Sequence, residues 1–553
     1  MIRPDNWSPT DGIILEPNAF RAVQERATNV VVTAGPGAGK TELLAQRADF
    51  LLMAGGCQYP RRILAISFKV DAARNIRERV RKRCGQHLSA RFDSFTFHAF
   101  AKRIIDSYRV LLTGQDALDP DYTIDANDRI EHRQITFKDL APLAIEILRK
   151  SPHARNAIRQ TYTHVFLDEF QDATTSQYAL LKEAFLGSGV VLTAVGDVKQ
   201  RIMSFAGALD GIMQIFATDF KALPLTLYQN FRSEPVLRRM QNRMVQVMDP
   251  SAAVPVDQLA GDGGSVEVLS FADPWAEAEE LADRIEDWLS KGVPPSEIAI
   301  LVRQQPLLVC EHLFAELADR GIPSRNEQVC QDLTAEPAPA LILNLIRVLA
   351  DDRRSTAYEQ LMRVVGGTSL TEEMALRNAS VLSRFLSTKR EYLRRGGEAR
   401  SDFDQWKVVI AEFLDLIDES VLRSLSPEYQ HGKRLHELIQ QTLEAFQEEL
   451  GKDGDPVAAL IRLSEEDAVR VLTIHKCKGL EFEKVVLLGV EGELFWGKTA
   501  DTRSEFFVAI SRAKNELILT WSRHRPRPAG APPGSRWDER RRPMQEFLDY
   551  TVE

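Results

Sequence analysis

Apolar positions along the first 260 residues form short runs that alternate with amphipathic segments. The run at 29–33 predicts a buried strand, and the spacing of apolar positions from 42 onward predicts a helix after it. Strands that alternate with helices are typical of a parallel α/β sheet. Further strand-like runs lie at 62–68, 90–98, 164–167, 190–195 and 225–228.

The second half of the chain repeats this pattern after a glycine-rich linker at 261–264. Near its end we expect a helix over 504–514 and a strand over 516–521. Two segments in the chain carry mainly helical patterns, which predicts an insertion into each α/β half. The expected domains are the first α/β domain at 1–102 and 162–260, its helical insertion at 103–161, the second α/β domain at 264–352 and 456–522, its helical insertion at 353–455, and a tail at 523–553.

Composition narrows the class of protein. A chain of 553 residues, 44% apolar and 27% charged, is expected to form several soluble domains. No apolar run approaches 18 residues, and no signal-peptide core is present, so we expect a cytoplasmic protein without a membrane contact. The five cysteines lack paired spacing, which argues against a zinc or iron–sulfur site. A net charge of −9 means that any DNA must be held by a local basic surface.

The tail differs from the rest in its charge. Residues 523–542 hold seven arginines and four prolines against two carboxylates. Such a segment is either a mobile surface tail or a DNA-binding arm, and the composition favours the mobile tail.

Residues 34–41 have the pattern of a phosphate-binding loop, because they lie between a predicted strand and a predicted helix. Glycines let backbone N–H groups surround phosphate oxygens, and the helix points its positive end at the same anion. Lys40 is expected at the β- and γ-phosphates of a nucleotide and Thr41 at Mg²⁺. The expected nucleotide-binding set begins with Ala34, Gly35, Pro36, Gly37, Ala38, Gly39, Lys40 and Thr41.

A carboxylate pair follows a second apolar run. Asp168 and Glu169 come directly after 165–167. Beside a phosphate-binding loop, Asp168 can hold Mg²⁺ and Glu169 can orient or deprotonate the attacking water. Asp-Glu is a common dipeptide, so it indicates a catalytic pair here only because it ends a predicted strand and the chain also contains a phosphate-binding loop.

With these two features in place, the chain resembles superfamily 1 DNA helicases of the UvrD/Rep/PcrA type. The resemblance covers nearly the whole chain and rests on the order of its motifs, since each motif alone is weak. The matching segments are 34–41 (motif I), 67–73 (Ia), 96–100 (Ib), 167–172 (II), 196–208 (III), 230–233 (IV), 473–482 (V) and 507–513 (VI).

The resemblance implies an α/β fold with two RecA-like parallel-sheet P-loop NTPase domains, each with a mainly helical insertion, and ATP with Mg²⁺ between them. Arg232 and Arg512 would reach the γ-phosphate, with Arg512 on an apolar helix face. Gln200 would sense that phosphate, and Glu481 would lie on the ribose side. The implied catalytic set is Lys40, Glu169, Gln200, Arg232 and Arg512.

The resemblance also implies contacts with single-stranded DNA and with junctions between single and double strands. Sequence-independent binding of a single strand uses aromatic faces for bases and polar groups for phosphates. Travel from 3′ to 5′ is implied by the family alone. Bases would stack or wedge on Phe68, Met203 and Phe205, and the DNA backbone would contact Thr96, His98, Thr473 and His475.

One departure from the family pattern concerns base selectivity. Alignment without gaps places Ala19 where many relatives have a glutamine that contacts adenine. Alanine offers no amide for this contact, so we expect weak discrimination among nucleoside triphosphates.

Two functions fit these features. The first is an ATP-dependent helicase and translocase of repair or recombination. The alternative is a helicase-like ATPase that senses DNA for a separate nuclease subunit, similar to the compact subunits of Gabija anti-phage systems. A non-hydrolysing relative is disfavoured, because Lys40, Asp168, Glu169, Gln200 and Arg512 are all present.

Overall fold

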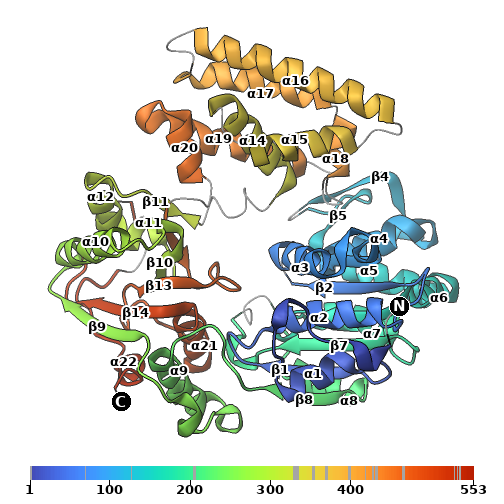
Figure 1. The fold of residues 1–553 in the computed structure, drawn as a ribbon, viewed down its shortest axis with the longest axis horizontal. Coiled ribbons are helices and arrows are strands. Elements are labelled where there is room, and N and C mark those ends of the chain that lie inside the picture. Colours follow the sequence, from blue (N-terminus) through green and yellow to red (C-terminus); the bar gives the residue numbers. More distant parts are fainter. Residues whose placement is uncertain are drawn as a thin grey trace. The chain divides into compact units, whose positions relative to one another are not determined.

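Six parallel strands form the first sheet of the protein (Figure 1). Their spatial order is β3 (Phe92–Thr96), β2 (Arg62–Ser67), β6 (Tyr162–Leu167), β7 (Val191–Gly196), β1 (Val30–Ala34) and β8 (Leu223–Leu227). The computed structural model describes residues 3–68, 70–125, 128–202, 207–327, 336–351, 355–367, 372–395, 400–417, 419–425, 429, 434–463, 468–528, 530–531, 534 and 537–552.

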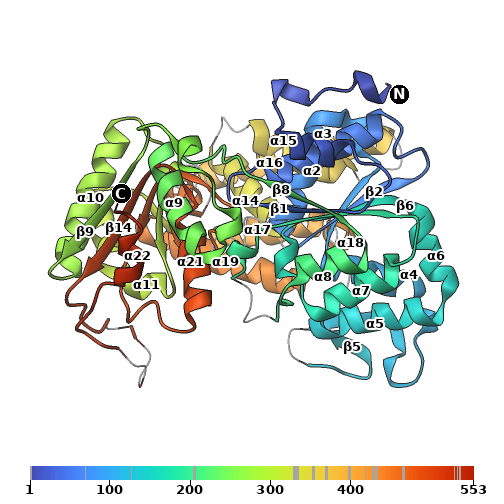
Figure 2. The same ribbon diagram turned by 90° about the horizontal axis from the view of Figure 1, so that it is seen from below.

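Helices cover both faces of this sheet, and alternate residues of each strand point to opposite faces. Val30 and Val32 pack in one core with α1 (Pro17–Gln24), α2 (Lys40–Met53) and α3 (Val70–Ser89). Val31 and Leu64 pack in the core on the other face. Figure 2 shows α2 and α3 on one side of the strands and α4, α5, α7 and α8 on the other. The helices of that second face are α4 (Phe97–Tyr108), α5 (Phe137–Lys150), α6 (Pro152–Thr161), α7 (Thr175–Phe185) and α8 (Ile212–Asp219).

Six further strands also pair in parallel, and they fall into two groups of three. β13 (Phe482–Leu487), β14 (Ala513–Ser522) and β9 (Ser265–Phe271) pair with one another. β11 (Ser324–Asn326), β12 (Val469–Thr473) and β10 (Ile298–Val302) form the other group. The α/β fold with parallel sheets, expected of two RecA-like domains, is therefore confirmed. The helices along these stretches are α9 (Pro235–Met248), α10 (Pro274–Ser290), α11 (Pro306–Val309), α12 (Glu311–Asp319), α21 (Thr499–Ile510) and α22 (Gln545–Asp549).

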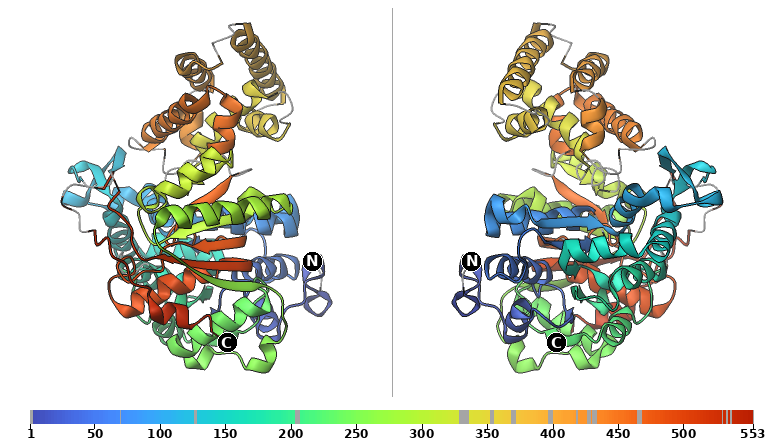
Figure 3. Two further views of the ribbon diagram at one scale, coloured as in Figure 1. Left: turned by 90° about the vertical axis from the view of Figure 1, so that its left-hand side faces the viewer. Right: turned by 90° about the vertical axis from the view of Figure 1, so that its right-hand side faces the viewer.

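A bundle of helices fills the predicted second insertion. One apolar core joins its helices around the fully buried Trp406. Figure 3 shows the bundle in yellow to orange. The first and last of its helices lie outside the predicted limits of 353–455, yet both pack into this core. The members are α14 (Pro337–Ala350), α15 (Ser355–Gly367), α16 (Glu372–Arg395), α17 (Phe403–Ile417), α18 (Glu419–Ser424), α19 (Arg434–Asp453) and α20 (Pro456–Leu463).

The segment 103–161 is helical in part, as predicted, but it also contains a small parallel sheet. β4 (Leu118–Asp125) pairs with β5 (His132–Thr136). The sequence patterns did not indicate this small sheet within the mainly helical insertion. Proline and three aspartates make β4 unlike a typical strand, because these residues are depleted in sheets.

The prediction of a mobile tail is wrong at two of its arginines. Arg525 and Arg541 are 2% and 7% exposed, and both lie against Glu491, which is fully buried. Arg525 donates to Oε1 of Glu491 over 2.9 Å, and the guanidinium of Arg541 lies 4.6 Å from the ring centre of Trp537. These residues anchor the chain end to the fold.

The chain divides into two compact units, 1–272 with 477–526 and 536–553, and 273–476 with 527–535. These units differ from the predicted domain limits, which remain predictions. Among the described residues, no helix has the length and apolar character needed to span a bilayer.

Candidate functional site

The carboxyl edge of the first sheet gathers most of the predicted site residues. Because all six strands are parallel, their carboxyl ends meet at one edge. The candidate nucleotide residues follow β6, β7, β1 and β8, and candidate DNA residues follow β3 and β2. β6 pairs with β2, so the two sets are neighbours along this edge.

The phosphate-binding loop occupies the turn between β1 and α2. Gly37 and Gly39 have φ angles of 70° and 76°, which side chains rarely tolerate. A Cβ on Gly37 would also lie 2.1 Å from Oδ1 of Asn230. Only glycine fits here, and the cradle suits a phosphate because backbone N–H groups of this turn and the start of α2 can surround an anion.

Lys40 curls over the loop at the start of α2. Its Nζ donates to the carbonyl oxygens of Ala34 and Gly35 over 3.3 and 3.2 Å. Burial lowers the pKa of Lys40, against the opposing pull of Glu169 and Asp197. A partly buried cation at this position fits the charge of a phosphate group.

Asp168 and Glu169 stand at the end of β6, as predicted. Burial and the neighbouring Glu169 raise the pKa of Asp168. Burial acts in the same direction on Glu169, but Lys478 and Lys40 outweigh it and lower the pKa of that carboxyl. Asp168 and the Thr41 hydroxyl are hard oxygen ligands, which fit Mg²⁺. Glu169 has a left-handed backbone with φ of 50°, a strained conformation of the kind that gathers at functional sites.

Lys478 of motif V contacts two carboxylates of motif II. Its Nζ pairs with Asp172, lies 3.8 Å from Glu169, and donates to the carbonyl oxygen of Gln200 over 2.9 Å. Lys478 and Asp172 are 8% and 1% exposed. The predicted set did not include Lys478.

Asp197, after β7, organises motif III. Its side chain is fully buried and accepts from Nε2 of Gln200 over 2.8 Å, and it pairs with Lys199 at 2.9 Å. Gln171 accepts from the backbone N–H of Asp197 and donates to Glu169 over 2.6 Å. Asp197 and Gln171 therefore connect Gln200 with the carboxylate pair through hydrogen bonds.

Arg512 is placed by a turn rather than by a helix. α21 ends at Ile510, so the helix expected to reach 514 and to carry Arg512 is wrong there. Arg512 is 2% exposed and donates to Oε1 of Gln200 over 2.8 Å and to the carbonyl oxygen of Val508 over 2.9 Å. Burial and the charge of Arg232 lower its pKa to about 10.

Arg232 lies beside the phosphate-binding loop, in a second charged contact. It donates to Oε2 of Glu481 over 2.8 Å and to the carbonyl oxygen of Ser511 over 2.9 Å. Its backbone N–H donates to Oδ1 of Asn230. Glu481 is therefore joined to the arginine of motif IV, while its expected place beside a ribose stays a prediction.

Several residues of this site were missed by reasoning from the sequence. Lys478, Asp197, Gln171 and Asn230 lie within the matched motifs, and that position was the only available signal. Phe231 is 65% exposed, and its backbone N–H donates to the carbonyl oxygen of Gly37. An exposed aromatic ring beside the phosphate-binding loop is a candidate platform for a nucleotide base.

The described DNA candidates of the first sheet lie at its β2 and β3 ends. Phe68 follows β2 and is half-buried, and Thr96 pairs with Ser67 at the end of β3. Thr96 caps α4, because its hydroxyl accepts from the N–H of Ala99 over 3.1 Å. His98 is exposed, with its ring centre 5.5 Å from that of Phe137.

Four predicted DNA contacts lie elsewhere. Met203 and Phe205 fall outside the described residues. Thr473 ends β12 and accepts from the N–H of Lys476 over 3.3 Å, and His475 follows it, half-buried. Thr473 and His475 belong to the second compact unit and Phe68, Thr96 and His98 to the first.

Ala19 is 4% exposed and packs in the core beneath α1 and α2. Asn18 beside it donates to the carbonyl oxygen of Thr226, and Glu16 accepts from the backbone N–H groups of Tyr228 and Gln229. The amide of Asn18 is therefore engaged with the protein, which leaves the predicted weak base discrimination in place.

Two family models and several curated relatives match this chain. The model of the UvrD/REP helicase N-terminal domain matches residues 15–133 and 126–221, and that of the UvrD-like helicase C-terminal domain matches 225–524. The chain is 24% identical to DNA helicase II of Escherichia coli, over 91% of this chain and 84% of the relative. It is 25% identical to the ATP-dependent DNA helicase Rep of E. coli, over 92% and 91%, and 23% identical to the ATP-dependent DNA helicase PcrA of Bacillus subtilis, over 92% and 82%.

Proposed function

The chain belongs to the UvrD-like helicase family and is an ATP-hydrolysing helicase, and on that basis we propose that it travels along single-stranded DNA and unwinds duplex DNA. The observation that carries the proposal is the continuous network from Glu169 through Gln171, Asp197 and Gln200 to Arg512. This network joins Glu169, which follows β6, to Asp197 and Gln200, which follow the neighbouring strand β7, and through Gln200 to Arg512.

Each part of the network has a role in phosphoryl transfer. The 35–39 turn and Lys40 would bind the phosphates, and Thr41 with Asp168 would hold Mg²⁺, which would supply positive charge to the phosphates. Glu169, kept ionised by Lys478 and Lys40, orients the attacking water and accepts its proton. Arg232 and Arg512 stabilise the charge that develops on the transferred group.

The same residues can couple hydrolysis to movement. Gln200 is held on one side by Asp197 and on the other by Arg512. A change at the γ-phosphate alters which of these two contacts is kept. β6 pairs with β2, and Phe68 directly follows β2. Phe68 and the His98–Phe137 ring pair supply aromatic surface to unpaired bases. We propose 3′ to 5′ travel because the motifs resemble those of the family.

A role in DNA repair or recombination is the first reading of this activity. The second is a DNA-sensing ATPase that serves a separate nuclease subunit in anti-phage defence. The observation favouring the second is compactness, since an alignment of 620 positions places only 91% of these 553 residues on DNA helicase II of E. coli. Recovery of a stoichiometric nuclease with the tagged chain from its native host would select the second.

The test measures steady-state ATP hydrolysis with and without a single-stranded homopolymer. The Glu169→Gln variant is the blank, since it keeps the shape of the side chain and removes the base. We expect strong stimulation by the homopolymer that is absent in the variant, and strand displacement on a duplex with a 3′ single-stranded tail. Hydrolysis that ignores single strands would contradict an autonomous translocase and favour the sensor.

A further inference from the structure

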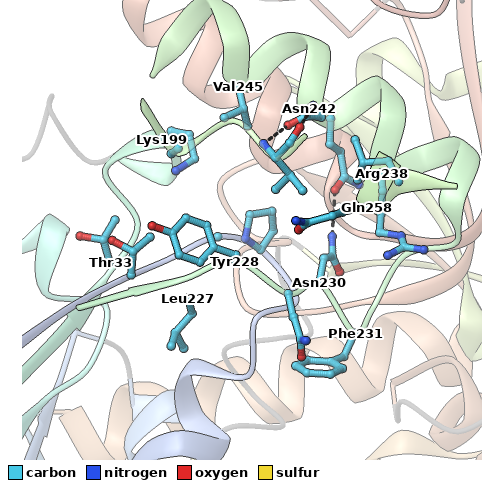
Figure 4. A pocket seen from close by; sticks show the side chains of 18 of the residues that line it. Thr33, Lys199, Leu227, Tyr228, Asn230, Phe231, Arg238, Asn242, Val245 and Gln258 are labelled. Carbon is cyan, nitrogen blue, oxygen red and sulfur yellow. Dashed lines mark hydrogen bonds between the residues drawn. The ribbon is translucent and has the colours of Figure 1, made fainter. Parts of the chain in front are cut away.

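A pocket lies against the phosphate-binding loop and shares Gly35, Pro36 and Phe231 with the candidate nucleotide residues. It has a volume of about 540 Å³, within the usual range for sites of small molecules. Gly35 and Pro36 form one wall, and Arg238 and Val245 of α9 form another. Figure 4 shows Tyr228 and Asn230 among the side chains that line the pocket. None of Lys40, Thr41, Asp168, Glu169 or Arg512 lines it.

The charge of the pocket is one-sided. Arg238 and Lys199 line it, and no aspartate or glutamate is among its described lining residues. Lys199 is neutralised by Asp197 at 2.9 Å. The Nε of Arg238 is buried and has no hydrogen-bond partner among the described residues. A buried donor without a partner costs free energy, so this guanidinium suits an anion.

The remaining walls combine apolar surface with fixed amides. Leu227, Val245, Val254 and Leu259 supply apolar contacts, and Tyr228, 52% exposed, supplies an aromatic ring. Asn242 is fixed by two hydrogen bonds to the backbone of Val254, at 2.9 and 2.8 Å. Apolar walls with a few oriented polar groups are the usual composition of a small-molecule site.

From these features we propose that the pocket binds a small aromatic anion, such as an aryl carboxylate, sulfonate or phosphate ester. The anionic group pairs with Arg238, and the flat body lies between Tyr228 and the apolar side chains. The occupant is distinct from the phosphates of the ATP that is hydrolysed, because Lys40, Thr41, Asp168, Glu169 and Arg512 do not line the pocket.

The side-chain amide of Asn230 connects the pocket with the catalytic residues. Asn230 donates to Gln241 over 3.1 Å on the pocket side and accepts from the N–H of Arg232 over 2.9 Å on the other. Its Oδ1 also lies against Gly37. An occupant that presses on Asn230 hinders adjustment of Arg232 and the loop around the nucleotide, and therefore slows hydrolysis. This last step rests on the proposed function, whereas binding itself does not.

The probe is 8-anilinonaphthalene-1-sulfonate, an aryl sulfonate whose fluorescence rises in apolar sites. The full chain is titrated with it, with and without a saturating non-hydrolysable ATP analogue. We expect one saturable site that the analogue does not displace. Arg238→Gln should weaken binding about tenfold or more, because it removes a charged hydrogen bond. Val245→Trp should abolish binding by filling the pocket.

The matched control is Arg243→Gln, which removes a charge from the same helix outside the pocket and should leave binding unchanged. Melting curves of each variant show that the fold is kept. Equal binding by the wild type and both pocket variants, or displacement by the ATP analogue, would overturn the site. Binding without slower ATP hydrolysis would overturn its regulatory effect alone, and the binding result stands even if the wild type hydrolyses no ATP.

Discussion

The guanidinium of Arg512 donates a hydrogen bond to Oε1 of Gln200 over 2.8 Å, across 312 positions of the chain. The other end of the Gln200 amide donates to Asp197 over 2.8 Å. Gln200 therefore cannot turn its amide without losing both contacts. This fixed orientation makes Gln200 the residue through which Arg512 and the motif III segment act on one another.

Replacement of Arg512 by alanine should lower the turnover number for ATP hydrolysis by about 10³, because arginines that stabilise phosphoryl transfer contribute at least this much. Arg512→Lys should recover only a small part, since lysine cannot bond Gln200 and Val508 together. Steady-state hydrolysis checks this prediction. Arg503→Gln on α21 is the control and should keep its rate. A rate for Arg512→Ala within tenfold of the wild type would contradict a catalytic role.

Removal of Lys478 should destabilise the protein. In Lys478→Met, Asp172 stays buried without its cation, which costs about 3–5 kcal/mol in comparable buried pairs. Denaturant unfolding measures this loss. The double variant Lys478→Met with Asp172→Leu should regain most of the stability, because no lone charge remains. Equal stability of the single and double variants would contradict the pairing.

Stability should fall with acid because of His164. Burial, with a further contribution from Arg47, lowers the pKa of His164 to about 3. The unfolded chain binds its proton below pH 6.5, so the folded state loses about 2 kcal/mol from this group between pH 6.5 and pH 5. Unfolding curves at several pH values test this. His164→Phe should flatten that decline, and an unchanged slope in the variant would assign it to other groups.

The C-terminal segment should detach when Glu491 loses its charge. Glu491→Gln removes the buried carboxylate that Arg525 and Arg541 contact, a loss of about 3–5 kcal/mol by the same reasoning. We expect faster proteolysis after 523 and a lower melting temperature. Glu539→Gln, at an exposed carboxylate of the same segment, is the control. Proteolysis at the wild-type rate would show that other contacts hold the segment.

Nucleotide selectivity should be weak. Ala19 offers no amide, and two exposed hydrogen bonds are worth about one to two kcal/mol, so GTP and UTP should be hydrolysed within about tenfold of ATP. Steady-state rates with each nucleotide give the answer. A strong preference for ATP would point to another group that contacts the base.

Local patterns in the sequence were sufficient for the strands of the first sheet and for the phosphate-binding loop. The apolar run at 29–33 and the glycines at 37 and 39 act through their immediate neighbours, since strand periodicity and positive φ depend on contiguous residues. The same reasoning failed at β4, whose polar composition hides a strand, and at Arg512, where a turn ends the helix early.

The sequence by itself determined which chemical groups are available: a phosphate loop, a carboxylate pair and arginines in ordered motifs. Only the tertiary structure decided which of them meet. Lys478 and Asp172 are 306 positions apart, and Arg525 with Arg541 converge on Glu491. Such pairs leave no local pattern in the sequence. A buried charge is costly unless it is paired, and its partner can come from any part of the chain that the fold places beside it.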